Sequence, residues 1–390
     1  EISACLVGSE MCIRDRTTTP ERKKEVDFTE PYMMTNNVML VKKSDKNKYK
    51  DLKDFTGKKI AAQKGTDQEK IAHNEIKDSQ VSSLNRLPES ILALKSGKVV
   101  GTIVEKPVGE AYLKQNPELE FADVKFNEEK KPTCIAVPKN SPILLKHLNQ
   151  TIDEVNNKNL IDKYMNQAAQ DMQDDGNFFT KYGSFFIKGI KNTILISLVG
   201  VILGSILGAF IALLKINKFK PLSWLASIYI EFLRGTPMLV QVFIVFFGTT
   251  AALGLDVSAL ICGTIALIIN SSAYIAEIIR AGINAVDKGQ MEAARSLGLN
   301  YIQTMKSVIM PQAIKNILPA LGNEFVTLIK ESSIVSTIGV GEIMFNAQVV
   351  QGISFDPFTP LIVAAVLYFI LTFALSRIMS LVEGRMKASD

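Results

Sequence analysis

The strongest constraint on the fold of this chain is an abrupt fall in charge near residue 180. Residues 1–180 carry 56 charged side chains, whereas residues 181–390 carry only 27. The later part contains apolar runs of about twenty residues or more, which is long enough to cross the hydrocarbon core of a bilayer. The earlier part has the charge density of a water-soluble domain. We therefore predict two dissimilar parts, one soluble and one embedded in the membrane.

Composition excludes several classes of function. The net charge of +5 belongs entirely to the later part, and a small basic excess beside apolar runs indicates membrane topology rather than nucleic-acid binding. The four cysteines form no CxxC pair and the two histidines stand alone, so we predict neither a metal site nor a redox motif. The sequence holds no set of nucleophile and base, so we expect no catalytic residues and no enzyme.

The earlier part alternates strand-like with helix-like segments. Such alternation predicts an α/β domain with a largely parallel sheet. Thr66 and Glu69 have the spacing of a capping box at a helix start. The expected strands are Val38–Lys42, Lys59–Gln63, Gly101–Val104 and Thr133–Val137, and the expected helices are Thr66–Asn74, Pro88–Ser96, Lys106–Gln115 and Ser141–Asn157.

The domain boundaries follow from composition. Residues 1–15 do not begin with Met and lack the basic start and the long apolar core of a signal peptide. We interpret them as a non-native segment. We then expect the soluble domain at 16–170, a polar linker at 171–180 and a membrane domain at 181–390.

A motif near the start of the soluble domain carries a family resemblance. The run Thr17–Lys24 (TTTPERKK) followed by Val26–Tyr32 (VDFTEPY) resembles a stretch of the amino-acid-binding proteins of ABC importers, and the likeness continues through Gly57–Thr66, Glu105–Pro107 and the strand near Cys134–Val137. The resemblance implies a two-lobed, periplasmic-binding-protein-like α/β domain of type II. The family has a strand–helix–strand segment before this motif, so we expect lobe 1 to be truncated and the domain partial.

The resemblance also assigns roles to individual residues. It implies that Arg22 grips the carboxylate of an amino acid with two charge-assisted bonds, and that Thr17 donates to it from its hydroxyl. Thr66, with the backbone amides at the start of its helix, provides a second anion site. Glu105 meets the ammonium group, and Gln63 lies where the family reads the substrate side chain.

Five segments of the later part are candidates for membrane spans. The second is less apolar than the others, and the fourth is interrupted by Glu324, Lys330 and Glu331. We predict an all-α domain of five spans. The expected spans are Ile190–Leu214, Trp224–Thr249, Ala259–Ala281, roughly Leu318–Phe345, and Thr359–Val382.

Lysine and arginine occur in alternate loops of this domain. The loops after the second and fourth segments contain neither, whereas the loops after the first and third segments and the C-terminus are basic. Basic loops stay in the cytoplasm. We therefore predict a multi-pass protein of the cell membrane, with its C-terminus in the cytoplasm and its soluble domain outside.

A second motif lies in the long basic segment after the third span. The matching residues are Glu292, Ala293, Ala294, Gly298 and Pro311, with Val308 and Met310 where Ile and Leu are usual. This pattern resembles the EAA signature of ABC importer permeases, in which two short helices dock on the ATPase subunit. Gly298 permits the positive φ that the end of a helix needs. The stretches Glu231–Pro237 and Asn323–Phe325 resemble the polar amino-acid branch of these permeases.

Together these motifs predict a solute-binding protein fused to a permease. The chain contains no phosphate-binding G-x4-G-K-[ST] loop, so we expect a separate ABC ATPase subunit to hold ATP and Mg, with no cofactor on this chain. The expected partners are an amino-acid ligand, the lipid bilayer and a second permease domain, identical or different. Glu324 either contacts a cationic amino acid or packs helices together. An amino-acid-gated channel or receptor is the alternative function.

Overall fold

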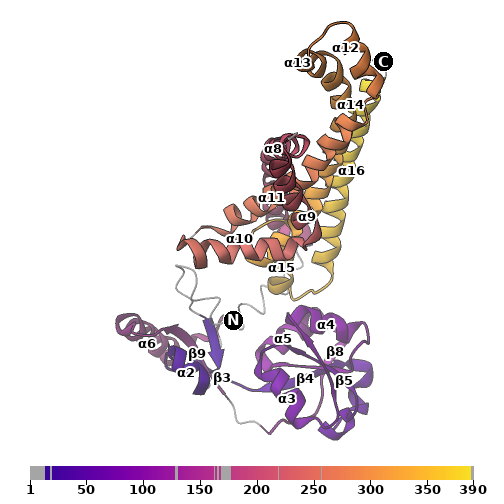
Figure 1. The fold of residues 1–390 in the computed structure, drawn as a ribbon. Coiled ribbons are helices and arrows are strands. Elements are labelled where there is room, and N and C mark those ends of the chain that lie inside the picture. Colours follow the sequence, from indigo (N-terminus) through magenta and orange to yellow (C-terminus); the bar gives the residue numbers. More distant parts are fainter. Residues whose placement is uncertain are drawn as a thin grey trace. The chain divides into compact units, whose positions relative to one another are not determined.

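The computed structural model describes residues 14–17, 20–127, 131–161, 163–164, 167, 177–217, 219–255 and 257–387. Nearly all of the expected non-native segment 1–15, and most of the expected linker 171–180, lie outside these residues. The described chain forms two compact units (Figure 1). The first comprises the residues up to Phe178 together with Val349–Pro360, and the second comprises Phe179–Gln348 together with the residues from Leu361 onward.

The first unit contains a four-stranded antiparallel sheet built around one strand. Strand β9 is the return strand that the sequence predicts, and all the other strands of this sheet pair with it in antiparallel fashion. In the sequence, helix α2 lies between β1 and β2, and helix α6 follows β9. The strands are β1 (Arg14–Thr17), β2 (Val26–Phe28), β3 (Met33–Thr35) and β9 (Lys131–Pro138), and the helices are α2 (Pro20–Glu25) and α6 (Pro142–Asn157).

A second sheet of the first unit has five strands in the order β6-β5-β7-β4-β8. Strand β5 is parallel to β6 and β7, whereas β4 is antiparallel to β7 and β8. The expectation of a largely parallel sheet is therefore wrong for β4, which runs opposite to the other four strands, and for β9, which belongs to the antiparallel sheet. The strands are β4 (Asn37–Lys42), β5 (Lys59–Gln63), β6 (Gln80–Leu84), β7 (Gly101–Glu105) and β8 (Leu119–Phe121), and the helices are α3 (Asp67–Glu75), α4 (Leu87–Lys95) and α5 (Lys106–Gln115), with 3-10 turns at Lys43–Lys48 and Leu52–Phe55.

Helices cover both faces of the second sheet. Met39 belongs to an apolar cluster with Ile71 of α3, whereas its neighbour Leu40 belongs to a different cluster with Ile91 of α4 and Tyr112 of α5. Successive residues of a strand point to opposite faces, so these two clusters lie on opposite sides of the sheet. Each large side chain buried in this way contributes about 1.5–3 kcal/mol.

The second unit is helical. Three of its helices, α8, α11 and α16, are long and apolar enough to cross a membrane, and two bent pairs, α9 with α10 and the segment Tyr301–Ile338 with α15, raise the number to five if each pair is one span. The helices therefore agree with the expected five spans if each bent pair crosses the membrane once. The helices are α8 (Phe178–Ile216), α9 (Lys220–Gly235), α10 (Met238–Leu253), α11 (Ala259–Asn284), α12 (Lys288–Ser296), α13 (Tyr301–Thr304), α14 (Met310–Glu331), α15 (Ile343–Ser354) and α16 (Thr359–Lys387).

The bend of 107° between α9 and α10 has an identifiable cause. Pro237 has no amide hydrogen and restricts the residue before it, so a helix stops there. The carbonyls at the end of α9 are then bonded by Gln241, whose side-chain amide donates to Leu233 O at 2.7 Å and to Thr236 O at 3.1 Å. Asn270 of α11 donates in turn to Gln241 Oε1 at 2.9 Å. This buried network holds the elbow against α11.

The second bent pair turns at a glycine. Gly339 ends the 3-10 helix η4 (Ser332–Ile338) with φ +91°, a conformation that suits glycine best. Glu342 follows and is fully buried. Its carboxylate accepts a hydrogen bond from the amide of Phe345 at 2.6 Å and another from the hydroxyl of Tyr368. The start of α15 is therefore fixed to α16.

Candidate functional site

Three of the predicted binding residues lie at one edge of the second sheet. Gln63 ends β5 and Glu105 ends β7, and these strands are parallel neighbours with Ala61 opposite Thr102. Thr66 is the N-cap residue of α3, which follows β5. Because carboxyl ends of parallel strands meet at the same edge, this is where an α/β sheet offers a binding site. The structure thus groups these residues, and their contact with an amino acid remains a prediction.

The start of α3 differs from the predicted capping box. The hydroxyl of Thr66 donates to Gln63 O at 2.6 Å instead of capping the helix. Glu69 reaches one residue further back and accepts from the amide of Gly65 at 2.7 Å, and it also accepts from the Ser83 hydroxyl. The capping-box prediction is wrong because Gly65, at φ +74°, turns its own amide toward that carboxylate. The amide of Gly65, which precedes the N-cap residue Thr66, is therefore bonded to a carboxylate of the same chain.

The remaining two predicted binding residues belong to the first sheet region. Thr17 is the last residue of β1, opposite Thr133 of β9, and Arg22 lies in α2. Their side chains lie outside the described residues. The carboxylate-binding role of Arg22 and the donor role of Thr17 remain predictions.

The EAA segment forms two short helices joined by a tight turn. Gly298 has φ +88°, so the predicted left-handed conformation is confirmed. Its amide donates to Arg295 O at 3.1 Å, and the amide of Leu299 donates to Ala294 O at 3.2 Å. These two bonds form the Schellman motif, which closes the end of α12. The side chains of Asn300 and Gln303 then cap α13 reciprocally.

The surface of this turn carries exposed apolar side chains that the motif does not include. Leu297 is 85% exposed and Ile302 is 75% exposed. Glu292 and Ala293 are exposed, whereas Ala294 is buried. Pro311 is the second residue of α14 and follows the π-helix Met305–Ile309 directly. We call residues Lys288–Thr304 the coupling knob. Its apolar tip was missed at the sequence level, because Leu and Ile beside a helix end are ordinary core residues.

Glu324 lies in the interior of the second unit. It is 7% exposed and belongs to α14, which packs against α11. Gly282 of α11 faces Ile317, and Gly263 faces Val335 beyond the end of α14, so Glu324 stands level with the middle of α11. At that level Asn270 Oδ1 is buried without a hydrogen-bond partner among the residues that the structure describes. Pro319 lies inside α14, five residues before Glu324.

Comparison with known proteins identifies both parts of the chain. Residues 9–176 match the family of bacterial extracellular solute-binding proteins, family 3, and residues 200–388 match the family of binding-protein-dependent transport system inner membrane components. The chain is 44% identical over 206 residues to the arginine transport system permease protein ArtQ of Bacillus subtilis, which covers 53% of this chain and 94% of that protein.

Two further proteins also match about half of this chain. The putative glutamine transport system permease protein GlnP of Rickettsia bellii is 42% identical over 205 residues, covering 53% of this chain and 94% of that protein. A crystal structure of an amino acid ABC transporter with histidines is 48% identical, covers 54% of this chain and 99% of its own, and has a TM-score of 0.52. The chain therefore belongs to the family of binding-protein-dependent inner membrane transport components, as an amino-acid ABC importer permease that carries a solute-binding domain.

Proposed function

We propose that this chain captures a polar amino acid outside the cell and passes it through the membrane, driven by an ATPase on a separate subunit. The observation that carries the proposal is the coupling knob, a rigid turn at Gly298 with the exposed apolar tips Leu297 and Ile302. Exposed apolar groups on a rigid turn suit docking to a second protein. An amino-acid-gated channel would not need such a docking surface, because it uses no ATPase subunit.

The proposed substrate is an amino acid with a cationic or amide side chain. The similar permeases are named for arginine and for glutamine. In this chain Gln63 offers an amide at the sheet edge, and the acids Glu105 and Glu324 suit a cationic group. A buried acid between membrane helices is costly unless it serves a partner, so Glu324 is the proposed contact within the membrane.

The proposed assembly follows from the same parts. Two permease domains, identical or different, line the route, and ATP and Mg are held by the ATPase subunit. The solute-binding domain faces the outside and the coupling knob faces the cytoplasm, in agreement with the distribution of lysine and arginine between loops.

The experiment is purification of the chain from its native membrane, followed by ATPase assays in lipid nanodiscs with each of the twenty amino acids. We expect an ABC ATPase to copurify and arginine or glutamine to raise ATP hydrolysis several-fold. Glu292→Ala is the matched variant, which should lose this stimulation without a change in amino-acid affinity. An ion current that an amino acid opens without ATP would overturn the proposal in favour of a channel.

A further inference from the structure

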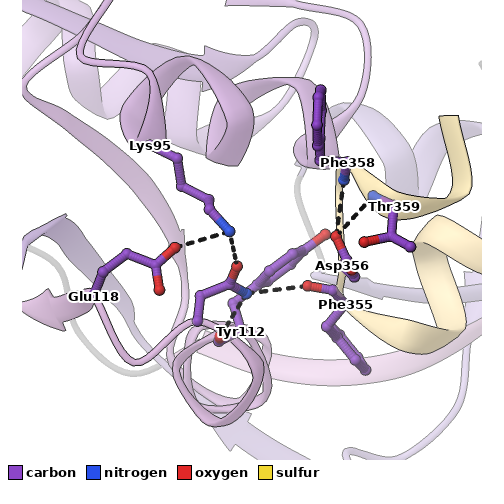
Figure 2. A network of polar contacts seen from close by, with 8 residues as sticks. Lys95, Tyr112, Glu118, Phe355, Asp356, Phe358 and Thr359 are labelled. Atoms are coloured by element: carbon purple, nitrogen blue, oxygen red, sulfur yellow. Dashed lines mark hydrogen bonds and ion pairs between the residues drawn. The ribbon is translucent and has the colours of Figure 1, made fainter. Parts of the chain in front are cut away.

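A segment between two helices of the permease sequence packs within the first compact unit. Residues Val349–Pro360, which we call the strap, link α15 to α16 along the chain. At its centre the ring of Phe355 meets Tyr112 of α5 edge-on, with ring centroids 5.1 Å apart and planes at 89° (Figure 2). Phe355 also packs against the apolar cluster beneath α4 and α5. Edge-on aromatic pairs are stabilising beyond the burial of their area.

The polar contacts of the strap use a buried amide of the same lobe. Asn116 is only 1% exposed. Its side-chain nitrogen donates to Tyr112 O at 2.9 Å and to Phe355 O at 3.1 Å, and its oxygen accepts from Lys95 at 2.6 Å. Buried amides need all their hydrogen bonds satisfied. One of the two amide hydrogens of Asn116 is satisfied by the strap alone.

The strap itself is held in a single conformation. Phe355 has φ +52°, which is uncommon for a bulky residue and persists only where the surroundings enforce it. Next to it, the Asp356 carboxylate accepts from the amides of Phe358 at 2.9 Å and Thr359 at 3.1 Å, which caps the start of α16 (Figure 2). On the other side, Gln351 of α15 donates to Pro357 O at 2.7 Å. The end of α15 and the start of α16 are thus held by residues next to Phe355.

We propose that the strap is a mechanical link between the lobe of the second sheet and the helices α15 and α16, with Phe355 as its anchor. Among the residues that the structure describes, its contacts include Arg86 at the start of α4, Tyr112 of α5 and Asn116. A movement of this lobe then reaches α15 and α16 through the strap. The proposal does not depend on which solute the domain binds.

The test is hydrogen–deuterium exchange of the full chain in lipid nanodiscs. Phe355→Asn removes the ring, and asparagine tolerates a positive φ. Phe358→Asn is the matched control, since Phe358 lies in the same strap but is 51% exposed. We expect Phe355→Asn to speed exchange about tenfold in peptides from both α5 and α15, because local opening becomes easier when an anchoring contact is lost. The control should leave both unchanged within about twofold.

Two results would overturn the proposal. In the first, Phe355→Asn speeds exchange in α5 but leaves exchange in α15 at the wild-type rate. This result would show that Phe355 only stabilises the lobe and does not link it to α15. An equal acceleration in Phe358→Asn would show general loosening of the strap. If Phe355→Asn accumulates poorly, Phe355→Leu decides, because it keeps an apolar side chain without the edge-on ring. There we expect about threefold faster exchange in both helices, and no change in either would refute the link.

Discussion

Arg22 is the single residue on which substrate capture is expected to depend most. A guanidinium can bind a carboxylate through two parallel hydrogen bonds, which contribute about 2–4 kcal/mol, or about 30- to 1000-fold in affinity. Arg22→Ala should weaken amino-acid binding by that factor, measured by calorimetry on a version of the protein with lobe 1 restored. Arg22→Lys should recover only part, because an ammonium group cannot form the fork. A Kd for Arg22→Ala within about twofold of the wild type would remove Arg22 from the site.

Glu69 makes the free energy of unfolding of the first unit depend on pH. Hydrogen bonds from the Ser83 hydroxyl and the Gly65 amide lower the pKa of Glu69 below its ordinary value of 4.5. The carboxylate therefore stabilises the folded state at pH above 4.5, and this contribution is lost as the pH falls through the lowered pKa.

Glu69→Gln should remove this part of the acid dependence. The melting temperature of the variant should lie below that of the wild type at pH 7, and the gap should narrow at lower pH, as followed by scanning calorimetry. Glu89→Gln, at an exposed position in α4, is the control and should give no gap. A gap for Glu69→Gln that is constant from pH 7 to pH 3 would contradict this account.

At the scale of elements, the turn between α12 and α13 is the clearest place to test the proposed coupling by mutation. A Cβ at Gly298 would meet no atom within 4 Å, so a substitution there is opposed by backbone strain alone. Gly298→Val should distort the turn, since left-handed backbone costs a β-branched residue at least ~1–2 kcal/mol. Gly298→Asn tolerates that backbone and serves as the matched control.

We expect Gly298→Val to lower amino-acid-stimulated ATP hydrolysis and uptake together in reconstituted complex, while amino-acid affinity stays unchanged. Gly298→Asn should retain most of both activities. Full activity in Gly298→Val would show that the turn has no part in coupling. A loss of amino-acid affinity alone would move this segment to another role.

The sequence predicts those elements whose signals are local. Strand β5 and helix α5 have the predicted ends, β4 and β7 differ from prediction by one residue at one end, and α3 and α4 are shifted by one residue at both ends. The antiparallel direction of β4 was not predictable, because strand direction depends on pairing across the sheet and not on the β4 residues themselves. The Glu69 bond to Gly65 was missed for a similar reason, since the positive φ of Gly65 places its amide there.

At the scale of the whole molecule, the step in charge near residue 180 anticipates the division into two units. The strap is an exception, because it lies after residue 180 in the sequence but belongs to the first unit. Its residues comprise the end of α15, the loop and the start of α16. Nothing in their local pattern indicates contact with Tyr112 or Asn116, which are more than two hundred residues away in the sequence. Long-range contacts of this kind depend on tertiary packing. Gln63, Thr66 and Glu105 could be predicted as binding residues, because the family resemblance assigns a role to each of them from its own stretch of sequence.

The proposed orientation makes a prediction for the entire chain. In a version with its four cysteines replaced by serine, Lys64→Cys should react with an impermeant maleimide on intact cells. Arg295→Cys, in the coupling knob, should react only after the membrane is permeabilised. Both side chains are exposed, so access and not burial decides the result. Labelling of Arg295→Cys on intact cells would reverse the orientation.

The position of Pro319 makes α14 a lever with unequal arms. Bending of a helix concentrates where proline removes a hydrogen bond, and Pro319 lies inside α14. At 1.5 Å per residue, Met310 at the start of α14 stands about 13.5 Å from this pivot, whereas Glu324 stands about 7.5 Å away. A bend of about 5° therefore moves the start of α14 by about 1.2 Å and Glu324 by about 0.7 Å. If the proposed docking of the coupling knob bends α14 at Pro319, the displacement at Glu324 is smaller than that at the start of the helix.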